Sequence, residues 1–235
     1  MKIAISGTYS TGKTTTTLAL AHLTGIPRTH AKTMREILPK AIPGKRLEEV
    51  NGPELVQLGM RRLLERSVHE SHLDEFISDG SSLHEWAYGM VRTDLGIHPD
   101  QDTDEGHIKL DENNEYLKEV MINFGAVAKD HALDTYDSFV HLPVEFPLVK
   151  DGHRPVSEKF RSASNDLLLE TINKLGIPVH IVGGSITERL NEITEIYNLN
   201  HVMSVDKAIE LAVKELEQEN IENEKTFSNK GNNHG

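Results

Sequence analysis

Short apolar runs, each bounded by glycine, proline or a charged residue, recur along the chain. They occur at 2–6, directly after Pro27, and at 76–78, 139–142 and 179–182. Runs of this length with such boundaries are typical of buried β-strands. We therefore predict about five strands, separated by segments long enough to form helices.

The longer segments between these runs carry apolar residues at helical spacing. We predict helices at 13–23, from Gly52 past Val68, and at 83–91, 115–131, 158–175, 187–197 and 205–217. In the second of these, five apolar residues share one helical face, which we expect to pack on the core. They are Val56, Met60, Leu63, Leu64 and Val68.

Alternating strands and helices predict an α/β fold of three layers, with about five parallel strands and helices on both faces. We expect a single domain over 1–220 with a small lid at about 147–162. The acidic, aperiodic segment 98–115 is expected to be a surface loop. Residues 221–235 are polar and are expected to be a disordered tail.

Composition narrows the possible functions. The 235 residues are 37% hydrophobic, contain no cysteine and carry a formal net charge of −12. This charge argues against a nucleic-acid partner, and the missing cysteines exclude disulfides and thiol catalysis. No apolar run approaches the ~20 residues of a membrane span, so we expect no membrane partner and a cytoplasmic location.

The most specific motif lies between the first predicted strand and the first predicted helix. Residues 7–14 read G-T-Y-S-T-G-K-T and match the phosphate-binding pattern G-x-x-x-x-G-K-[ST]. Backbone N–H groups of such a loop and the following helix N-terminus bind phosphates, which predicts ATP and Mg²⁺ as cofactors. The alternative is a chance match in a turn rich in glycine and threonine.

Each position of this motif has an expected role. Lys13 reaches the terminal phosphates, Thr14 offers its hydroxyl to Mg²⁺, and Thr15 contacts the region of the α-phosphate. The expected nucleotide-binding residues are Gly7, Thr8, Ser10, Thr11, Gly12, Lys13, Thr14 and Thr15.

Asp79 ends the strand predicted at 76–78. Carboxyl ends of parallel strands face the ligand in such folds, so Asp79 is a candidate for metal binding and for accepting the proton of an acceptor hydroxyl. The alternative is a turn residue, because Asp79 to Ser82 is also favourable turn chemistry.

A basic segment precedes the helix predicted at 158–175. It contains Lys150, Arg154, Lys159 and Arg161. Cations on a loop with glycine and proline suit a lid that closes over phosphates, so Arg154 and Arg161 are candidate catalytic residues. An ordinary solvated basic loop is the alternative.

Two groups are candidates for an acceptor pocket, and a third suggests a metal site. Residues His84, Glu85, Trp86 and Tyr88 follow Asp79, although Trp86 is equally explained as core; Arg28, His30 and Arg35 follow the second strand. The third group, His98, Asp100, Asp102, Asp104 and His107, is better explained as a solvated acidic loop.

The order of these motifs resembles that in AAA_28-type P-loop kinases, which include the nicotinamide riboside kinase domain of bacterial NAD regulators. The resemblance rests on residues 7–14, Asp79 and 151–154, and continues through 158–161, 167–182 and 185–190, so that it covers about residues 1–200. Thymidylate-kinase-like enzymes are similar more distantly.

This resemblance implies a P-loop NTPase fold with a five-stranded parallel sheet and phosphoryl transfer from ATP to a small acceptor. By matching positions, Lys13 and Thr14 hold phosphate and Mg²⁺, Asp79 is the strand-end acid, and Arg154 and Arg161 are lid cations. Gly80 follows Asp79 where thymidylate-kinase-like relatives have arginine, and residues 80–115 do not match a nicotinamide riboside pocket.

We therefore expect an ATP-dependent small-molecule kinase acting on a nucleoside, nucleotide or other hydroxyl-bearing metabolite. The alternatives are an NTP-hydrolysing ATPase and a nucleotide-binding regulatory module without catalysis. The segment 150–161 favours the kinase, and the missing arginine after Asp79 keeps the regulatory module open.

Overall fold

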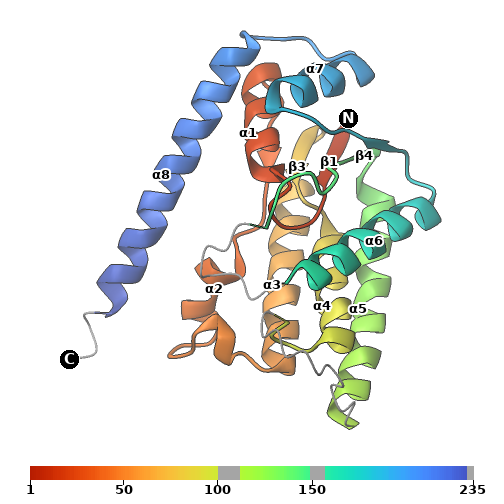
Figure 1. The fold of residues 1–235 in the computed structure, drawn as a ribbon, viewed down its shortest axis with the longest axis vertical. Helices are drawn as coiled ribbons and strands as arrows, with labels where there is room; N and C mark the ends of the chain where they lie inside the picture. Colours follow the sequence, from red (N-terminus) through yellow and green to blue (C-terminus); the bar gives the residue numbers. More distant parts are fainter. Residues whose placement is uncertain (100–111, 149–156, 232–235) are drawn as a thin grey trace.

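The computed structural model describes residues 1–99, 112–148 and 157–231. Its centre is a five-stranded sheet in the order β2-β3-β1-β4-β5, and every neighbouring pair is parallel. The strands are β1 (Lys2–Ser6), β2 (Arg28–Thr29), β3 (Phe76–Asp79), β4 (Ser138–His141) and β5 (Val179–Ile181). This confirms the predicted sheet (Figure 1).

Eight α-helices and one 3-10 helix, η1, occur in the described parts of the chain. They are α1 (Lys13–Thr24), α2 (Met34–Ala41), η1 (Leu47–Glu49), α3 (Gly52–Glu70), α4 (Ser82–Leu95), α5 (Glu112–Thr135), α6 (Glu158–Leu175), α7 (Ile186–Ile196) and α8 (Val205–Gly231). The helix α2 was not predicted, and its start is fixed by a capping box in which Thr33 and Glu36 satisfy each other's backbone N–H groups.

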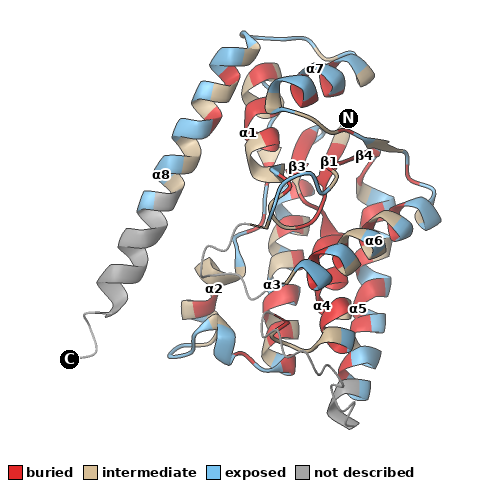
Figure 2. Cartoon of the chain, in the orientation of Figure 1, coloured by how far each residue is buried: buried red, intermediate tan, exposed pale blue. Residues whose placement is uncertain are grey.

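Alternation along the strands divides the core into two layers. Ile3 and Ile5 of β1 pack with α1, α7 and α8, whereas Ala4 faces the layer formed by α3, α4, α5 and α6. Successive side chains of a strand point to opposite faces, so a short strand covered on both sides must be apolar throughout. Figure 2 shows the buried residues gathered in the strands and on the inward sides of the helices.

One helix does not pack as predicted. Met60, Leu64 and Val68 of α3 are exposed, with 57%, 65% and 52% of their surface accessible. Leu63 is buried as predicted, but the rest of the inward face is formed by Leu55 and Leu58 and by the charged pair Arg66 and Glu70. The prediction was wrong because Arg66 and Glu70 neutralise each other and can occupy a buried face that an apolar count assigns elsewhere.

The C-terminal segment also differs from expectation. The helix α8 continues to Gly231, so residues 221–231 are helical, and 232–235 lie outside the described residues. This stretch is rich in glutamate and lysine, which favour helix even without an apolar face. The segments expected as an acidic loop and as a lid fall mainly on 100–111 and 149–156, which also lie outside the described residues.

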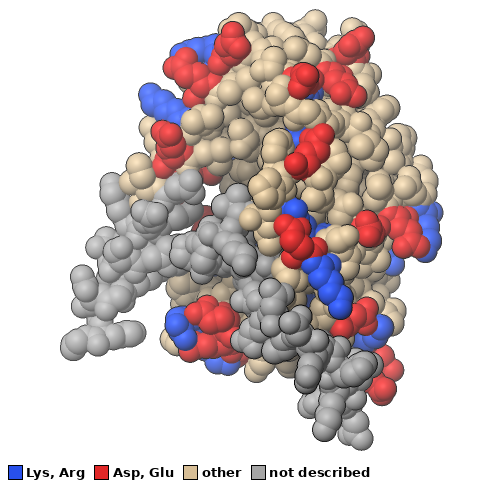
Figure 3. All heavy atoms as spheres, viewed as in Figure 1, with Lys and Arg blue, Asp and Glu red and all other residues tan. Residues whose placement is uncertain are grey.

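Two surface observations accompany the fold. On the face drawn in Figure 3, the described Lys and Arg side chains lie in small groups beside Asp and Glu. Among the described residues, no helix is both long and apolar enough to cross a membrane.

Candidate active site

The segment between β1 and α1 forms a closed turn that only glycine permits at its ends. Gly7 and Gly12 have φ angles of 134° and 84°. A Cβ atom on Gly7 would lie 2.7 Å from the carbonyl oxygen of Leu142 and 2.8 Å from Oγ1 of Thr11. A larger residue would therefore push the turn away from β4.

Lys13 extends across this turn. Its Nζ donates a hydrogen bond to the carbonyl oxygen of Thr8 at 2.6 Å, and Oγ1 of Thr11 donates to the same oxygen at 3.0 Å. The N-cap residue of α1 is Gly12, which has no side-chain oxygen to satisfy the N–H groups of the first turn. Such N–H groups and an ammonium group are the groups with which proteins bind phosphates.

His84 of α4 supports the turn from one side. Its Nδ1 accepts a hydrogen bond from the backbone N–H of Ser81 at 2.9 Å, which leaves Nε2 to donate to the carbonyl oxygen of Gly7 at 3.1 Å. Burial, followed by the charges of Lys13 and Arg66, holds the pKa of His84 well below its usual value. The neutral ring therefore connects the start of α4 to the first glycine of the motif.

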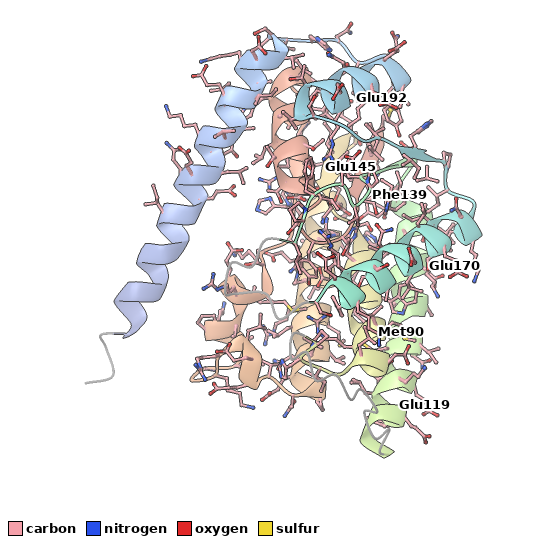
Figure 4. All side chains as sticks on the ribbon, in the orientation of Figure 1. Met90, Glu119, Phe139, Glu145, Glu170 and Glu192 are labelled. Carbon is pink, nitrogen blue, oxygen red and sulfur yellow. The ribbon has the colours of Figure 1, made fainter. Side chains whose placement is uncertain are left out.

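Arg189 of α7 supports the turn from the other side. Its Nη1 donates to the carbonyl oxygen of Thr11 at 2.6 Å, and its Nη2 forms an ion pair of 2.8 Å with Glu145. Glu145, labelled in Figure 4, also accepts hydrogen bonds from the backbone N–H of Gly184. One buried guanidinium thus ties the turn to the segments that follow β4 and β5.

Aromatic rings fix the middle of the turn. Tyr9 stacks on Tyr88 of α4 with ring centroids 4.6 Å apart, and Phe160 of α6 lies 6.2 Å from Tyr9. The guanidinium of Arg92 lies over the ring of Phe160, 4.6 Å from its centroid. The turn is thereby connected to α4 and α6 by flat, stiff side chains.

A cavity of about 190 Å³ adjoins the turn on the side of α1 and α7. It is lined by Gly12, Thr15, Thr16, Phe146, Gly184, Ile186 and Arg189. Two buried polar atoms on its walls, Oγ1 of Thr16 and Nε of Arg189, have no hydrogen-bond partner among the described residues. Buried polar atoms nearly always have partners, so these two are available to a ligand.

Asp79 lies where the sequence predicted it, at the carboxyl end of β3. The register pairs it with Ile5 of β1, and the backbone N–H of Gly80 donates to the Ile5 carbonyl oxygen at 3.0 Å. Its carboxylate is not free, because Oδ2 lies 3.0 Å from Nη2 of Arg28. Arg28, an acceptor-pocket candidate from the sequence, is thus the ion-pair partner of the candidate acid.

A buried charge network lies beneath Asp79. Arg66 of α3 donates to the carbonyl oxygen of Asp79 at 3.0 Å and to Oγ of Ser78 at 2.6 Å. Glu70 neutralises Arg66 and accepts hydrogen bonds from Thr29 and Tyr136. The network therefore fixes the end of β3, and burial raises the pKa of Tyr136 so that this group remains a donor.

A second, narrower cavity lies between α2, α3, α4 and α5. It is lined by Met34, Leu55, Val56, Gly59, Glu85, Tyr88, Gly89, Arg92, Leu117, Met121 and Phe124. Of the residues expected here, Glu85 and Tyr88 line it, whereas His84 supports the phosphate-binding turn. Trp86 is core: it is 5% exposed and belongs to the apolar cluster under the sheet.

The other candidates are distributed as follows. His30 is exposed after β2, and Arg35 lies in the first turn of α2. Nε2 of His98 bonds to the carbonyl oxygen of Val50 at 3.1 Å. The described residues contain no cluster of three or more His, Asp or Glu that suits a metal ion. A metal at this site would therefore depend on Thr14, Asp79 and the ligand's phosphates.

The predicted lid cations are only partly described. Arg161 is buried in the first turn of α6, where Nε donates to Oε2 of Glu158 at 2.9 Å and Nη1 donates to the carbonyl oxygen of Phe146 at 2.8 Å. Arg154 lies outside the described residues. The role of both arginines in phosphoryl transfer remains a prediction.

Neither the contact of Arg189 with the turn nor the bond from His84 to Gly7 was predicted from the sequence. Arg189 is 178 positions from Thr11, and only the strand order brings the two together. A signal for His84 did exist, because Ser81 and His84 have the spacing of an N-cap and its N3 partner.

The sheet order, the glycine-bounded turn and its lysine define a P-loop protein with a kinase-like fold. The AAA_28 family model, described as an AAA domain, matches residues 2–189. The chain belongs to this family. No curated protein sequence matches the chain.

Solved structures with the same fold include nucleoside and nucleotide kinases. A deoxyadenosine kinase from M. mycoides with bound dATP has a TM-score of 0.59 and 18% identity, covering 84% of this chain and 100% of the other. Thymidylate kinase from Candida albicans has a TM-score of 0.57 and 15% identity, covering 88% and 92%.

The NadR protein in complex with NR has a TM-score of 0.56 and 15% identity, and the match covers 86% of this chain and 53% of that chain. At these identities the similarity shows the fold alone. It confirms the predicted resemblance and leaves the substrate to be inferred from this chain's own residues.

Proposed function

We propose that the protein is a Mg-ATP-dependent kinase that phosphorylates a small hydroxyl-bearing acceptor of nucleoside or nucleotide type. The observation that carries this proposal is a second cavity near the P-loop, lined in part by Tyr88, whose ring stacks on Tyr9 of the loop. The first cavity lies beside α1 and α7 and would take the nucleotide. The second lies between α2, α3, α4 and α5, has a volume of about 10 Å³, and would have to open to take an acceptor. A hydrolase would need only the cavity for the nucleotide.

The transfer step follows from this arrangement. The acceptor hydroxyl oxygen forms a bond to the γ-phosphorus, the bond to the β–γ bridging oxygen breaks, and ADP leaves. Asp79 takes the proton of the hydroxyl, and Lys13 together with the N–H groups of α1 stabilises the transferring charge. Thr14 would hold Mg²⁺, which supplies charge neutralisation at the phosphates. We also propose that the protein is cytoplasmic.

A second candidate, a nucleotide-binding module without catalysis, is favoured by one observation. The carboxylate of Asp79 is paired with Arg28, and Gly80 leaves the strand end without its own arginine. Such a protein would bind ATP but would not transfer phosphate. The kinase is preferred because the acceptor-side cavity contains a buried carboxylate, which a pure nucleotide sensor does not need.

The two candidates are separated by measuring ADP release from the full chain with Mg-ATP, with and without nucleosides and nucleoside monophosphates. Release that requires an acceptor supports the kinase. Release independent of any acceptor indicates a hydrolase, and ATP binding without release indicates the binding module. Lys13→Ala, which removes the ammonium group, serves as the inactive reference.

A further inference from the structure

The acceptor-side cavity contains a carboxylate oxygen that lacks a partner. Glu85 of α4 is 5% exposed. Its Oε1 lies 3.0 Å from Nε of Arg62, but its Oε2 is buried and has no hydrogen-bond partner among the described residues. Buried polar atoms nearly always have partners, so an unsatisfied oxygen on a cavity wall indicates that a ligand supplies the donor.

The remaining walls of this cavity are mostly apolar. Met34, Leu55, Met121 and Phe124 line it, together with the ring of Tyr88. The other charged residue of the lining, Arg92, already donates to the carbonyl oxygens of Ile97 and Tyr88. Apolar and aromatic walls with few polar groups are typical of sites for small organic ligands, where the polar groups fix the orientation. Apolar and aromatic walls suit a planar ring, and Glu85 would then accept a hydrogen bond from one edge of that ring.

The cavity has a route by which it can open. Its present volume of about 10 Å³ holds roughly one water molecule. Met121 packs directly against Gly89, so the tip of this side chain fills space that a residue larger than glycine would occupy. Methionine side chains are unbranched and change rotamer readily, so movement of Met34 and Met121 would admit a ring.

The cavity also adjoins the phosphate-binding turn. Tyr88 lies one helical turn after Glu85, lines the same cavity, and stacks on Tyr9 of the P-loop with ring centroids 4.6 Å apart. A ring held at Glu85 would therefore be separated from the turn by a single layer of side chains.

We propose that Glu85 selects acceptors whose ring carries an exocyclic amino group, with Oε2 accepting its hydrogen bond. This rests on the proposed kinase function. A carboxylate is an acceptor only, so it pairs with an amino group and repels a ring carbonyl at the same position. Arg62 neutralises the charge of Glu85 and pairs with Oε1, which leaves Oε2 available to a ligand.

The test uses nucleoside pairs that differ at one ring position. Binding of adenosine, purine riboside and inosine to the full chain is measured by calorimetry, and nucleoside-dependent ADP release is measured in parallel. Purine riboside lacks the amino group, and inosine has a carbonyl in its place. The wild-type protein is expected to bind adenosine at least about tenfold more tightly than either analogue, the loss that follows when a charged partner is left unpaired.

The variant Glu85→Gln has nearly the same shape and can turn its amide N–H₂ toward a carbonyl. Its preference for adenosine over inosine is expected to fall at least about tenfold. Glu119→Gln on the exposed surface of the neighbouring helix α5, labelled in Figure 4, is the matched control and should keep the wild-type preference. Thermal unfolding and ATP affinity of both variants show whether they are folded.

The outcomes separate this inference from the proposed function. Nucleoside-dependent ADP release with equal affinity for adenosine and purine riboside would overturn the role of Glu85 and leave the kinase intact. An amino preference in binding without ADP release would support Glu85 and contradict the kinase. Neither binding nor turnover with these nucleosides would overturn the role of Glu85, and the panel that includes nucleoside monophosphates would then decide on the kinase. If Glu85→Gln is unfolded, the comparison of the three nucleosides on the wild-type protein still shows whether an exocyclic amino group is preferred.

Discussion

Arg28 holds Asp79 by an ion pair of 3.0 Å between Nη2 and Oδ2, and both side chains are only 11% exposed. The two residues belong to neighbouring strands: Arg28 begins β2, in register with Ile77, and Asp79 ends β3. The candidate acid is therefore fixed in place before any ligand arrives. A carboxylate oriented in this way can serve catalysis only if its second oxygen faces the acceptor or the metal ion.

Asp79→Asn tests this arrangement. The amide keeps the size of the side chain but cannot take a proton, so we expect kcat for acceptor phosphorylation to fall about 10²-fold or more. ATP affinity should change much less, because the loop at residues 7–14 is formed by other residues. Steady-state kinetics and calorimetric titration with ATP measure the two effects separately.

The control for this variant is Asp134→Asn, at an exposed position near the end of α5. It should leave kcat, ATP affinity and stability unchanged. If Asp79→Asn instead lowers stability strongly and leaves the kcat of the folded fraction intact, Asp79 is a structural turn residue paired with Arg28 and has no chemical role.

Lys13→Ala tests the phosphate site. The substitution removes the ammonium group that now bonds to the carbonyl oxygen of Thr8, and with it the charge that would meet the terminal phosphates. We expect the thermal stabilisation produced by Mg-ATP to disappear, along with turnover. Lys174→Ala on the exposed side of α6 is the control. Unchanged ATP affinity in Lys13→Ala would contradict the assignment of the P-loop.

Local patterns predicted the parts of the site that are close in sequence. The turn at 7–14 and the strand ending at Asp79 are fixed by glycine positions and by apolar runs of a few residues, and both were predicted. The support of the turn by Arg189 was not, because it depends on the packing of α7 beside α1. Pairwise contacts across the sheet have no signature in a single sequence.

The same limit explains the misread face of α3. Hydrophobic periodicity assigned Met60, Leu64 and Val68 to the core, but the structure buries Arg66 and Glu70 there. Charged residues are rarely buried unless they are paired, and the partners Ser78, Thr29 and Tyr136 come from other elements. Periodicity measures the apolar residues of one helix and contains no information on such partners.

Stability is expected to decrease as the pH falls below about 6.5, the usual pKa of histidine. Burial lowers the pKa of His84, His131 and His141 in the folded protein. In that range the unfolded chain binds protons that the folded chain does not, so protonation favours unfolding. Each such histidine contributes up to about 1.4 kcal/mol per pH unit between its folded and unfolded pKa values.

Urea unfolding at about pH 7.5, 6.5 and 5.5 measures this dependence. His84→Gln should reduce the change in the free energy of unfolding between the two lower pH values by up to about 1.4 kcal/mol, the contribution of one proton over one pH unit. His69→Gln, on the exposed side of α3, controls for the loss of a histidine as such. A free energy of unfolding that is constant across this range would show that the buried histidines accept protons without unfolding.

Arg66→Met should destabilise the protein by about 3–5 kcal/mol, the cost of leaving a buried charge without its partner. Arg66 and Glu70 are only 2% and 1% exposed, and Arg66 also bonds to the carbonyl oxygen of Asp79. Lys174→Met, which breaks an exposed pair with Glu170, should cost at most about 0.5 kcal/mol. The free energies of unfolding in urea give both values. If Arg66→Met also lowers kcat while ATP affinity is retained, the network positions Asp79; if it costs as little as Lys174→Met, Glu70 is not held by Arg66 in solution.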